Sequence, residues 1–285
     1  MSTAALHDIS APPNMLLAEL TTIEWERVRK SLRPIFMPLR EVLYEPGMNI
    51  SHLYFPTTSV IAISCVLADG RADAVTLIGR EGFAGVEVFL GGDSAACRAV
   101  VLSQGWCYRI ERELLNRECG RGGSMRSVLL RYTQSYFTQV AQTSVCNRHH
   151  SIDQQLCRWL LMFLDRQASN ELAFTQEQIA DLIGVRRESV TEAARKLQLT
   201  GSIRYQHGHI SVVDRMDLET RSRECYEIAT READRLLAMS HRSGKVASVQ
   251  AAANGSAACV QRRPPMHRKT MPKGEISCFT PSPSY

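Results

Sequence analysis

The strongest constraint on the fold is a pattern of two short helices, a glycine and a hairpin over residues 174–213. Thr175 precedes a helical run and can cap it, and a glutamine three residues later stands at the capping-box position. Gly184 follows where a sharp turn needs a positive φ angle. Residues 186–199 predict a second helix, and residues 203–213 alternate about a glycine as a β-hairpin does. The pattern is typical of a winged helix-turn-helix, whose second helix enters the major groove of DNA.

Basic residues gather on the second predicted helix and the hairpin. Five Lys or Arg and two Glu lie between Arg186 and His209. Arginine can donate two hydrogen bonds to guanine, glutamate can accept one from cytosine, and other basic groups can hold phosphates. An αα-corner of a helical protein is the alternative interpretation, but the ordered set of cap, turn, basic helix and hairpin favours DNA binding. The predicted DNA-binding residues are Thr175, Gln176, Arg186, Arg187, Glu188, Ser189, Thr191, Glu192, Arg195, Lys196, Arg204, His207 and His209.

The chain before this pattern predicts a β-rich region and then one long helix. In residues 40–112, short apolar runs alternate with turn formers, which is typical of a compact antiparallel barrel or sandwich. In residues 124–149, apolar residues recur at three- and four-residue spacing. This apolar stripe can pack on the β-rich region, pair with a second copy of the chain, or do both. The predicted dimer-interface residues are Val128, Leu129, Tyr132, Tyr136 and Val140.

The formal net charge of the 285-residue chain is +5, but the charge is unevenly distributed. Residues 241–285 carry seven Lys or Arg and one Glu, so this tail contributes +6 and the rest of the chain −1. The tail lacks sustained periodicity and cannot bury enough apolar surface to offset its chain entropy. We therefore predict that residues 239–285 are disordered and that the net charge says little about what the folded part binds.

Cysteine content and hydropathy predict the compartment. The nine cysteines are an odd number without a CxxC motif, which argues against a disulfide framework or a zinc ribbon and favours a reducing cytoplasm. No apolar run is long enough for a membrane helix, and the N-terminus lacks the features of a signal peptide. Cys65 lies in an apolar pattern typical of a buried thiol, whereas Cys97 and Cys119 stand near arginines that could lower a thiol pKa.

Over about residues 15–235 the chain resembles the Crp/Fnr superfamily of transcription regulators. The strongest match is the run TQEQIADLIGVRRESV, which starts at Thr175. The segments LYFP, LADGR and GREGFAG, which start at Leu53, Leu67 and Gly79, match the sensor half of that family. The resemblance implies an α+β fold with a jelly-roll (double-stranded β-helix) sensor domain, a dimerisation helix and a winged helix-turn-helix, which the disordered tail expected from composition follows. The predicted domains are residues 15–123 (sensor), 124–149 (dimerisation helix), 150–238 (DNA-binding) and 239–285 (basic tail).

The resemblance also implies partners and residue roles. Arg187 falls on the family position that contacts guanine, and Glu188 on the position that contacts the paired cytosine strand. Glu192 stands where the family often has arginine, so a shifted half-site is expected. The implied partners are double-stranded DNA at a palindromic promoter site, a second copy of the chain in a homodimer, a small-molecule effector of unknown identity, and RNA polymerase if the protein activates transcription.

The predicted effector pocket comprises Gly85, Val86, Arg98 and Ala99. In cAMP-binding relatives, a Gly-Glu pair holds the ribose and an Arg-Ser or Arg-Thr pair holds the cyclic phosphate. Val86 cannot accept a hydrogen bond from a ribose hydroxyl, which leaves that group unpaired at a cost of about 1–3 kcal/mol. Ala99 stands where a hydroxyl residue is expected. The sequence therefore argues against cyclic-nucleotide binding and leaves the effector open.

No cofactor, metal or catalytic site is predicted. The N-terminal cysteine cluster of iron–sulfur relatives is absent, because the first cysteine is Cys65. His149 and His150 are adjacent, and adjacent side chains on a helix point about 100° apart, so a hinge role is expected rather than a shared metal. An enzyme on a cupin-like jelly roll needs several histidines in the barrel, but His52 is the only histidine in residues 40–112.

One alternative function stays open at this point. The chain could be an effector- or partner-binding module whose helix-turn-helix no longer contacts specific DNA. Glu192 on the second helix is the feature that supports this alternative. The salt dependence of DNA affinity distinguishes the two functions, because genuine phosphate contacts weaken steeply with salt.

Overall fold

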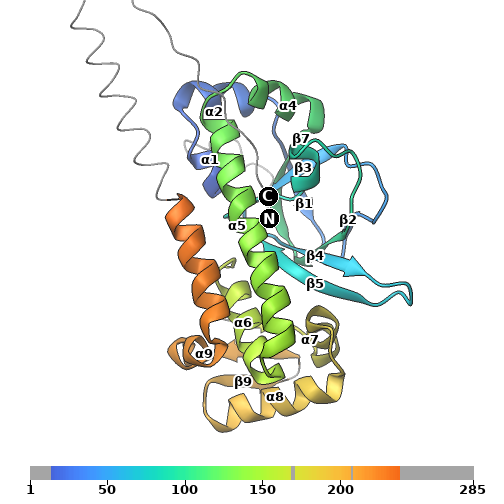
Figure 1. Ribbon diagram of the computed structural model, residues 1–285, viewed down its shortest axis with the longest axis vertical. Helices are drawn as coiled ribbons and strands as arrows, with labels where there is room; N and C mark the ends of the chain where they lie inside the picture. Colours follow the sequence, from blue (N-terminus) through green and yellow to red (C-terminus); the bar gives the residue numbers. More distant parts are fainter. Residues whose placement is uncertain (1–13, 168–170, 207, 238–285) are drawn as a thin grey trace, which may run out of the picture. The chain divides into compact units, whose positions relative to one another are not determined.

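The structure, a computed structural model, describes residues 14–167, 171–206 and 208–237. The predicted disordered tail, residues 239–285, lies outside the described residues, as does residue 238 at the end of the predicted DNA-binding domain. The described chain has the predicted α+β fold, with a β-rich half, one long helix, and a mainly helical half that contains a small sheet (Figure 1).

Two antiparallel sheets form the β-rich half, which has the predicted sensor fold. One sheet has the strand order β1-β7-β3 and the other the order β2-β6-β4-β5. The sheets are formed by β1 (Arg33–Met37), β2 (Val42–Tyr44), β3 (His52–Pro56), β4 (Val60–Val66), β5 (Ala72–Ile78), β6 (Arg98–Ser103) and β7 (Gly105–Glu111). Because pairing partners such as β1 and β7 lie far apart in the sequence, the chain must wind back on itself as a jelly roll does.

Alternating strand residues point between the sheets and form the first core. Leu53 and Phe55 on β3 are fully buried, and the ring of Phe55 stacks on that of Phe83 at 5.6 Å between centroids. Four helices border this core: α1 (Met15–Ala18), α2 (Thr22–Val28), α3 (Val86–Phe89) and α4 (Arg112–Gly120). Burial of this apolar set supplies the main driving force for folding of the β-rich half.

The predicted long helix is α5 (Ser124–His149), which lies beside the β-rich half and reaches the C-terminal half (Figure 1). Its N-terminus is held by Glu24 of α2, whose carboxylate accepts hydrogen bonds from the Ser124 N–H at 2.8 Å and from the Ser124 hydroxyl. Gly123 precedes the helix with φ +97°, and a Cβ atom there would overlap the Glu24 carboxylate. This junction therefore requires glycine.

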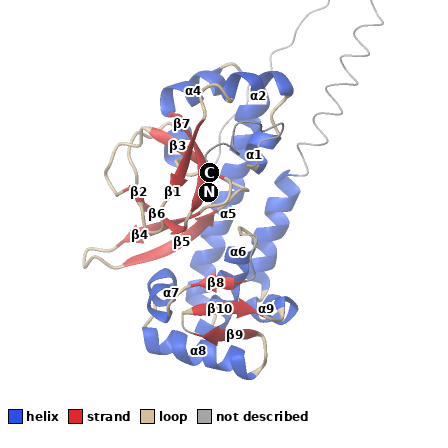
Figure 2. Ribbon diagram, turned by 180° about the vertical axis from the view of Figure 1, so that it is seen from behind, coloured by secondary structure: helices blue, strands red, loops and turns tan. Residues whose placement is uncertain are grey.

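The C-terminal half begins where Ser151 caps the next helix through a capping box. Its elements are α6 (Ile152–Leu164), β8 (Glu171–Ala173), α7 (Gln176–Ile183), α8 (Arg187–Leu199), β9 (Ile203–Gln206), β10 (His209–Val212) and α9 (Arg215–Ser222), followed by helical residues 224–237. The three strands form a small antiparallel sheet of order β8-β10-β9, which lies among the helices of this half (Figure 2).

A second hydrophobic core joins the two halves. It contains inward residues of α6, α7 and α8 together with β-strand residues of the first half, among them Val60, Ala62, Ala74 and Leu77. The described residues accordingly fall within one compact unit. The chain does turn between α5 and α6, near the predicted domain boundary, but the packing does not divide there.

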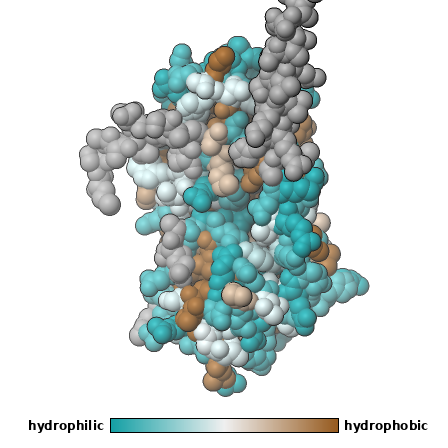
Figure 3. All heavy atoms as spheres, turned by 90° about the vertical axis from the view of Figure 1, so that its left-hand side faces the viewer, coloured by the Kyte–Doolittle hydropathy of each residue, from teal (hydrophilic) through white to brown (hydrophobic). Residues whose placement is uncertain are grey.

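The surface gives two further observations. None of the described helices combines the length and the apolarity that crossing a bilayer requires. On the face shown in Figure 3, hydrophilic side chains predominate and the apolar ones form separate patches.

Candidate nucleic-acid interface

Local capping and a glycine turn fix the geometry of the two helices α7 and α8. The Thr175 hydroxyl accepts a hydrogen bond from the Gln178 N–H at 3.2 Å, and the Gln178 side chain accepts one from the Thr175 N–H at 2.9 Å. Gly184 ends α7 in the left-handed region, with φ +75°. A Cβ atom on Gly184 would lie 2.7 Å from the Asp73 carboxylate of β5, so the turn is pressed against the β-rich half.

Helix α8 has one buried and one exposed face. Val190, Ala193, Ala194 and Leu197 are buried at the spacing of one helical face. The Thr191 hydroxyl donates to the Gln176 side-chain oxygen at 2.7 Å, so this pair holds α8 against α7. Ser189 is half-buried, and the exposed predicted DNA-binding residues of α8 and its N-cap are Arg186, Arg187, Glu188, Thr191, Glu192, Arg195 and Lys196.

The cations of this surface differ in their pairing. Arg186, Arg187, Arg195 and Arg204 are exposed, and none forms an ion pair with another residue in the described part of the chain. Lys196 instead lies 3.3 Å from Glu192 and 3.3 Å from Asp153, and its hydrogen bonds to these carboxylates raise its pKa. Lys196 is therefore held by two carboxylates, that of Glu192 on its own helix and that of Asp153 on α6.

The predicted wing is present as the hairpin of β9 and β10. Ile203 and Ile210 face the second core, whereas Arg204 and His209 are exposed. The Gly208 turn has φ +80°, as a tight hairpin turn requires. His207, the third predicted DNA-binding residue of the wing, lies outside the described residues. Arg204 and His209 thus extend the exposed basic surface of α8.

The exposed apolar face of α5 differs from the predicted one. Val128 is 2% and Leu129 0% exposed, because both pack in the core of their own chain. Tyr132 and Tyr136 are half-buried, with the Tyr132 ring 5.1 Å from that of Phe83, and Val140 is also half-buried. The exposed apolar residues of α5 are Leu130, Phe137, Ala141 and Val145, whose spacing of seven, four and four places them on one helical face.

The predicted effector pocket lacks a free cation. Arg98 bonds both carboxylate oxygens of Glu45, at 3.0 and 2.9 Å. Val86 is 4% exposed and Ala99 is fully buried, so neither presents a polar group to a ligand. Gly85 has φ +100° and caps α3, which identifies it as a turn glycine. Among these four described residues, the side chains offer a ligand no hydroxyl or carboxylate, and the one cation is already ion-paired.

A cavity not anticipated from the sequence lies elsewhere. Its volume is about 340 Å³, and it is lined by the β-rich half, α5, α6 and helical residues 224–237. Charged lining residues include Arg80, Glu81, Arg131 and Arg166. A ligand in this cavity would contact both halves at once. The lining residues are far apart in the sequence, so only the tertiary fold brings them together.

The thiols also differ from the prediction. Cys65 is exposed rather than buried, and its Sγ atom lies 3.1 Å from that of Cys97. Burial raises the pKa of Cys97 to about 12 and that of Cys119 to about 11. The neighbouring arginines therefore do not produce low-pKa thiols at these positions.

Comparisons with known proteins match both halves. Residues 35–121 match the family model for the cyclic nucleotide-binding domain, and residues 154–221 match that for the Crp-like helix-turn-helix domain. No curated protein matches. Among solved structures, a transcriptional regulator of the Crp/Fnr family from Eubacterium rectale has a TM-score of 0.59 at 18% identity, over 73% of this chain and 98% of that one.

Two further solved structures share the fold. FixK2 from Bradyrhizobium japonicum has a TM-score of 0.57 at 17% identity, over 66% of this chain and 96% of that one. The c-di-GMP-responsive global regulator CLP from Xanthomonas campestris has a TM-score of 0.55 at 16% identity, over 67% and 99% of the two chains. At these identities the likeness establishes the fold, while the family models identify the two domains.

Proposed function

Because the chain belongs to the Crp/Fnr family of transcription regulators, we propose that it binds a palindromic promoter site as a homodimer. The observation that carries the proposal is a set of four exposed arginines on α8, its N-cap and the wing, which form no ion pair with any other described residue: Arg186, Arg187, Arg195 and Arg204. Such cations are available to nucleic acid, since no neighbouring described carboxylate has to be displaced first. Promoter binding also assigns the protein to the cytoplasm.

The first turn of α8 supplies the base contacts. Arg187 donates two hydrogen bonds to guanine, and Glu188 accepts from the cytosine amino group of the neighbouring strand. Arg186, Arg195 and Arg204, with His209 of the wing, contact phosphates on either side of the groove. Thr175 and Gln176 lie at the N-terminus of α7, where backbone N–H groups favour a phosphate.

In the proposed homodimer, two copies of helix α5 pair about the twofold axis. We assign the dimer seam to Leu130, Phe137, Ala141 and Val145, because these are the apolar residues that α5 leaves exposed. Pairing two such helices presents two copies of α8 to successive major grooves, about 34 Å apart. The substitution Phe137→Asp should convert the dimer to a monomer in sedimentation analysis, whereas Asn147→Asp, at an exposed polar position of the same helix outside this apolar face, should not.

Sequence-specific binding is tested by selecting sites from random duplex DNA and measuring affinity by fluorescence anisotropy. Arg187→Ala should cost about 1–3 kcal/mol, a loss of about 5- to 150-fold, and should relax the preference at one base pair of each half-site. Lys196→Ala is the matched control, because its ammonium group is held by Glu192 and Asp153. It should leave base preference unchanged.

Two results would refute the proposal. One is that the wild type selects no sequence, and the other is that Arg187→Ala changes neither affinity nor base preference. Either result would favour the alternative of a binding module whose helix-turn-helix does not contact specific DNA. Affinity that falls with salt in the wild type would still report phosphate contacts, with a smaller slope in Arg195→Ala.

A further inference from the structure

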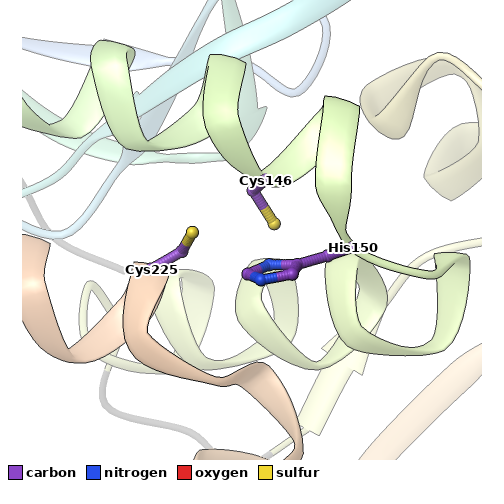
Figure 4. A group of neighbouring side chains, drawn as sticks. All are labelled: Cys146, His150 and Cys225. Atoms are coloured by element: carbon purple, nitrogen blue, oxygen red, sulfur yellow. The ribbon is translucent and has the colours of Figure 1, made fainter.

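Three metal-ligating side chains meet where α5 ends (Figure 4). Cys146 lies on the last turn of α5, His150 is the residue that ends the helix, and Cys225 lies in helical residues 224–237. One ligand atom from each residue lies within 4.8 Å of the other two. Figure 4 shows the two sulfur atoms and the imidazole ring turned toward a common centre.

The local backbone explains how these residues converge. Cys146 and His150 are four residues apart, and the His150 N–H donates to the Cys146 carbonyl at 3.0 Å, so both face the same side. Arg223 has φ +59°, a conformation uncommon for a residue other than glycine, and it separates α9 from helical residues 224–237. That turn places Cys225 in the first turn of the next helix, opposite the end of α5.

The His150 ring has an unsatisfied nitrogen. Its side chain is 10% exposed, and its Nδ1 atom is buried without a hydrogen-bond partner among the described residues. Its Nε2 atom lies 3.5 Å from Oε1 of Glu224. A buried ring nitrogen without a partner is costly, and a ligating histidine commonly directs its other nitrogen to a carboxylate in this manner.

We propose that Cys146, Cys225 and Nδ1 of His150 form a binding site for one thiophilic d10 metal ion of the Zn²⁺ type. Two sulfur atoms and one imidazole are a donor set that zinc favours, and a water molecule completes the tetrahedron. Each thiol transfers its proton to solvent as its sulfur binds the ion, so two protons are released per ion. Glu224 accepts the Nε2–H hydrogen bond and fixes the tautomer. The ion ties the end of α5 to the segment that follows the helix-turn-helix.

A Cys146–Cys225 disulfide is the competing chemistry. It would consume both sulfur atoms but would leave the buried Nδ1 of His150 without a partner. A metal ion satisfies all three atoms, which is why we assign the site to a metal. The assignment does not depend on DNA binding, so it can fail or stand independently of the proposed function.

The test uses the full-length chain, reduced with a phosphine and stripped with a chelator. Co²⁺ is added as a spectroscopic probe, because tetrahedral thiolate ligation produces intense d–d and thiolate-to-metal charge-transfer bands. Zn²⁺ is then added to displace Co²⁺. We expect these bands in the wild type, their loss on adding Zn²⁺, and one tightly held Zn²⁺ per chain by elemental analysis after gel filtration.

Matched variants assign the ligands. Cys146→Ser, Cys225→Ser and His150→Gln should each abolish the charge-transfer band or weaken Zn²⁺ binding at least tenfold. Glu224→Gln should weaken it about tenfold, the lower limit for a residue that orients a ligand. The controls are Cys97→Ser, which alters the other close cysteine pair, and His149→Gln, which alters the exposed histidine beside the site. Both should bind metal as the wild type does.

A measurement on the wild type covers the case in which a ligand variant fails to fold. Zn²⁺ should slow the alkylation of Cys146 and Cys225, mapped by mass spectrometry, without slowing that of Cys65. The proposal is overturned if the reduced wild type gives no thiolate–Co²⁺ band, if protection falls on other cysteines, or if Cys146 and Cys225 are recovered as a disulfide and the reduced chain retains no Zn²⁺.

Discussion

The substitution Gly184→Ala tests the turn between α7 and α8 and its contact with β5. The left-handed φ of +75° costs a non-glycine residue about 1–2 kcal/mol. The new Cβ atom would also lie 2.7 Å from the carboxylate of Asp73. Overpacking costs about 1–3 kcal/mol, and the lower part of that range applies because the half-buried Asp73 side chain can shift. We therefore expect Gly184→Ala to lower the free energy of unfolding by about 2–4 kcal/mol.

A matched glycine separates the two costs. Gly201 has φ +79°, but a Cβ atom there would meet nothing within 4 Å. Gly201→Ala should therefore cost only the backbone contribution, about 1–2 kcal/mol. In a double-mutant cycle, Asp73→Ala should relieve the excess cost of Gly184→Ala and leave the backbone contribution in place.

Urea unfolding followed by far-ultraviolet circular dichroism measures all of these values. The explanation fails at the backbone level if Gly184→Ala costs less than about 0.5 kcal/mol, within the range of neutral surface substitutions. The packing explanation fails if Gly184→Ala and Gly201→Ala lower the free energy of unfolding equally and the cycle shows no coupling between Gly184→Ala and Asp73→Ala. The second result would mean that the helix-turn-helix does not rest on β5 in solution.

Acid, cyclic nucleotides and oxidants are expected to act on three other parts of the molecule. Burial raises the pKa of Glu24, but hydrogen bonds, first that from Ser124, outweigh burial and lower the pKa to about 2 from 4.5. The ionised carboxylate should therefore stabilise the fold fully above about pH 4.5, and this stabilisation should be lost as the pH falls toward 2. Urea unfolding of Glu24→Gln should lack this pH dependence. Calorimetry should detect no micromolar binding of cAMP or cGMP, because Arg98 is already ion-paired; micromolar affinity would contradict this. Diamide should form a disulfide between Cys65 and Cys97, whose Sγ atoms are 3.1 Å apart, and the reaction should accelerate with rising pH because the pKa of Cys97 is raised; a peptide map with both thiols free would refute it.

The helix-turn-helix could be predicted because its determinants are local. The Thr175 cap, the Gly184 turn and the apolar spacing of α8 act within a few residues of one another, and the structure has each of them. The pairing of Lys196 with Asp153 could not be predicted, because the two residues belong to helices whose packing arises from the tertiary fold.

The sequence could not show which apolar residues of α5 stay exposed, because the helix is apolar on more than one side. Val128 and Leu129 fit the periodicity as well as Leu130 and Phe137 do, and periodicity alone does not say which pair the β-rich half covers. Contacts between residues that are distant in the sequence could not be predicted either. Cys146 and Cys225 are far apart in the sequence, so nothing in their spacing indicated that they meet.

The second core has a consequence for exchanging modules between relatives. Val60, Ala62, Ala74 and Leu77 of the β-rich half are covered by helices of the C-terminal half. A chimaera joined between α5 and α6 would keep the connection between these helices intact. It would, however, pack helices from the relative on an apolar surface that is complementary to the native helices. A transplant that carries β4 and β5 along with the helices would keep that surface intact. The unit that can be exchanged between relatives is therefore defined by which residues pack together, and the turn between α5 and α6 does not mark its boundary.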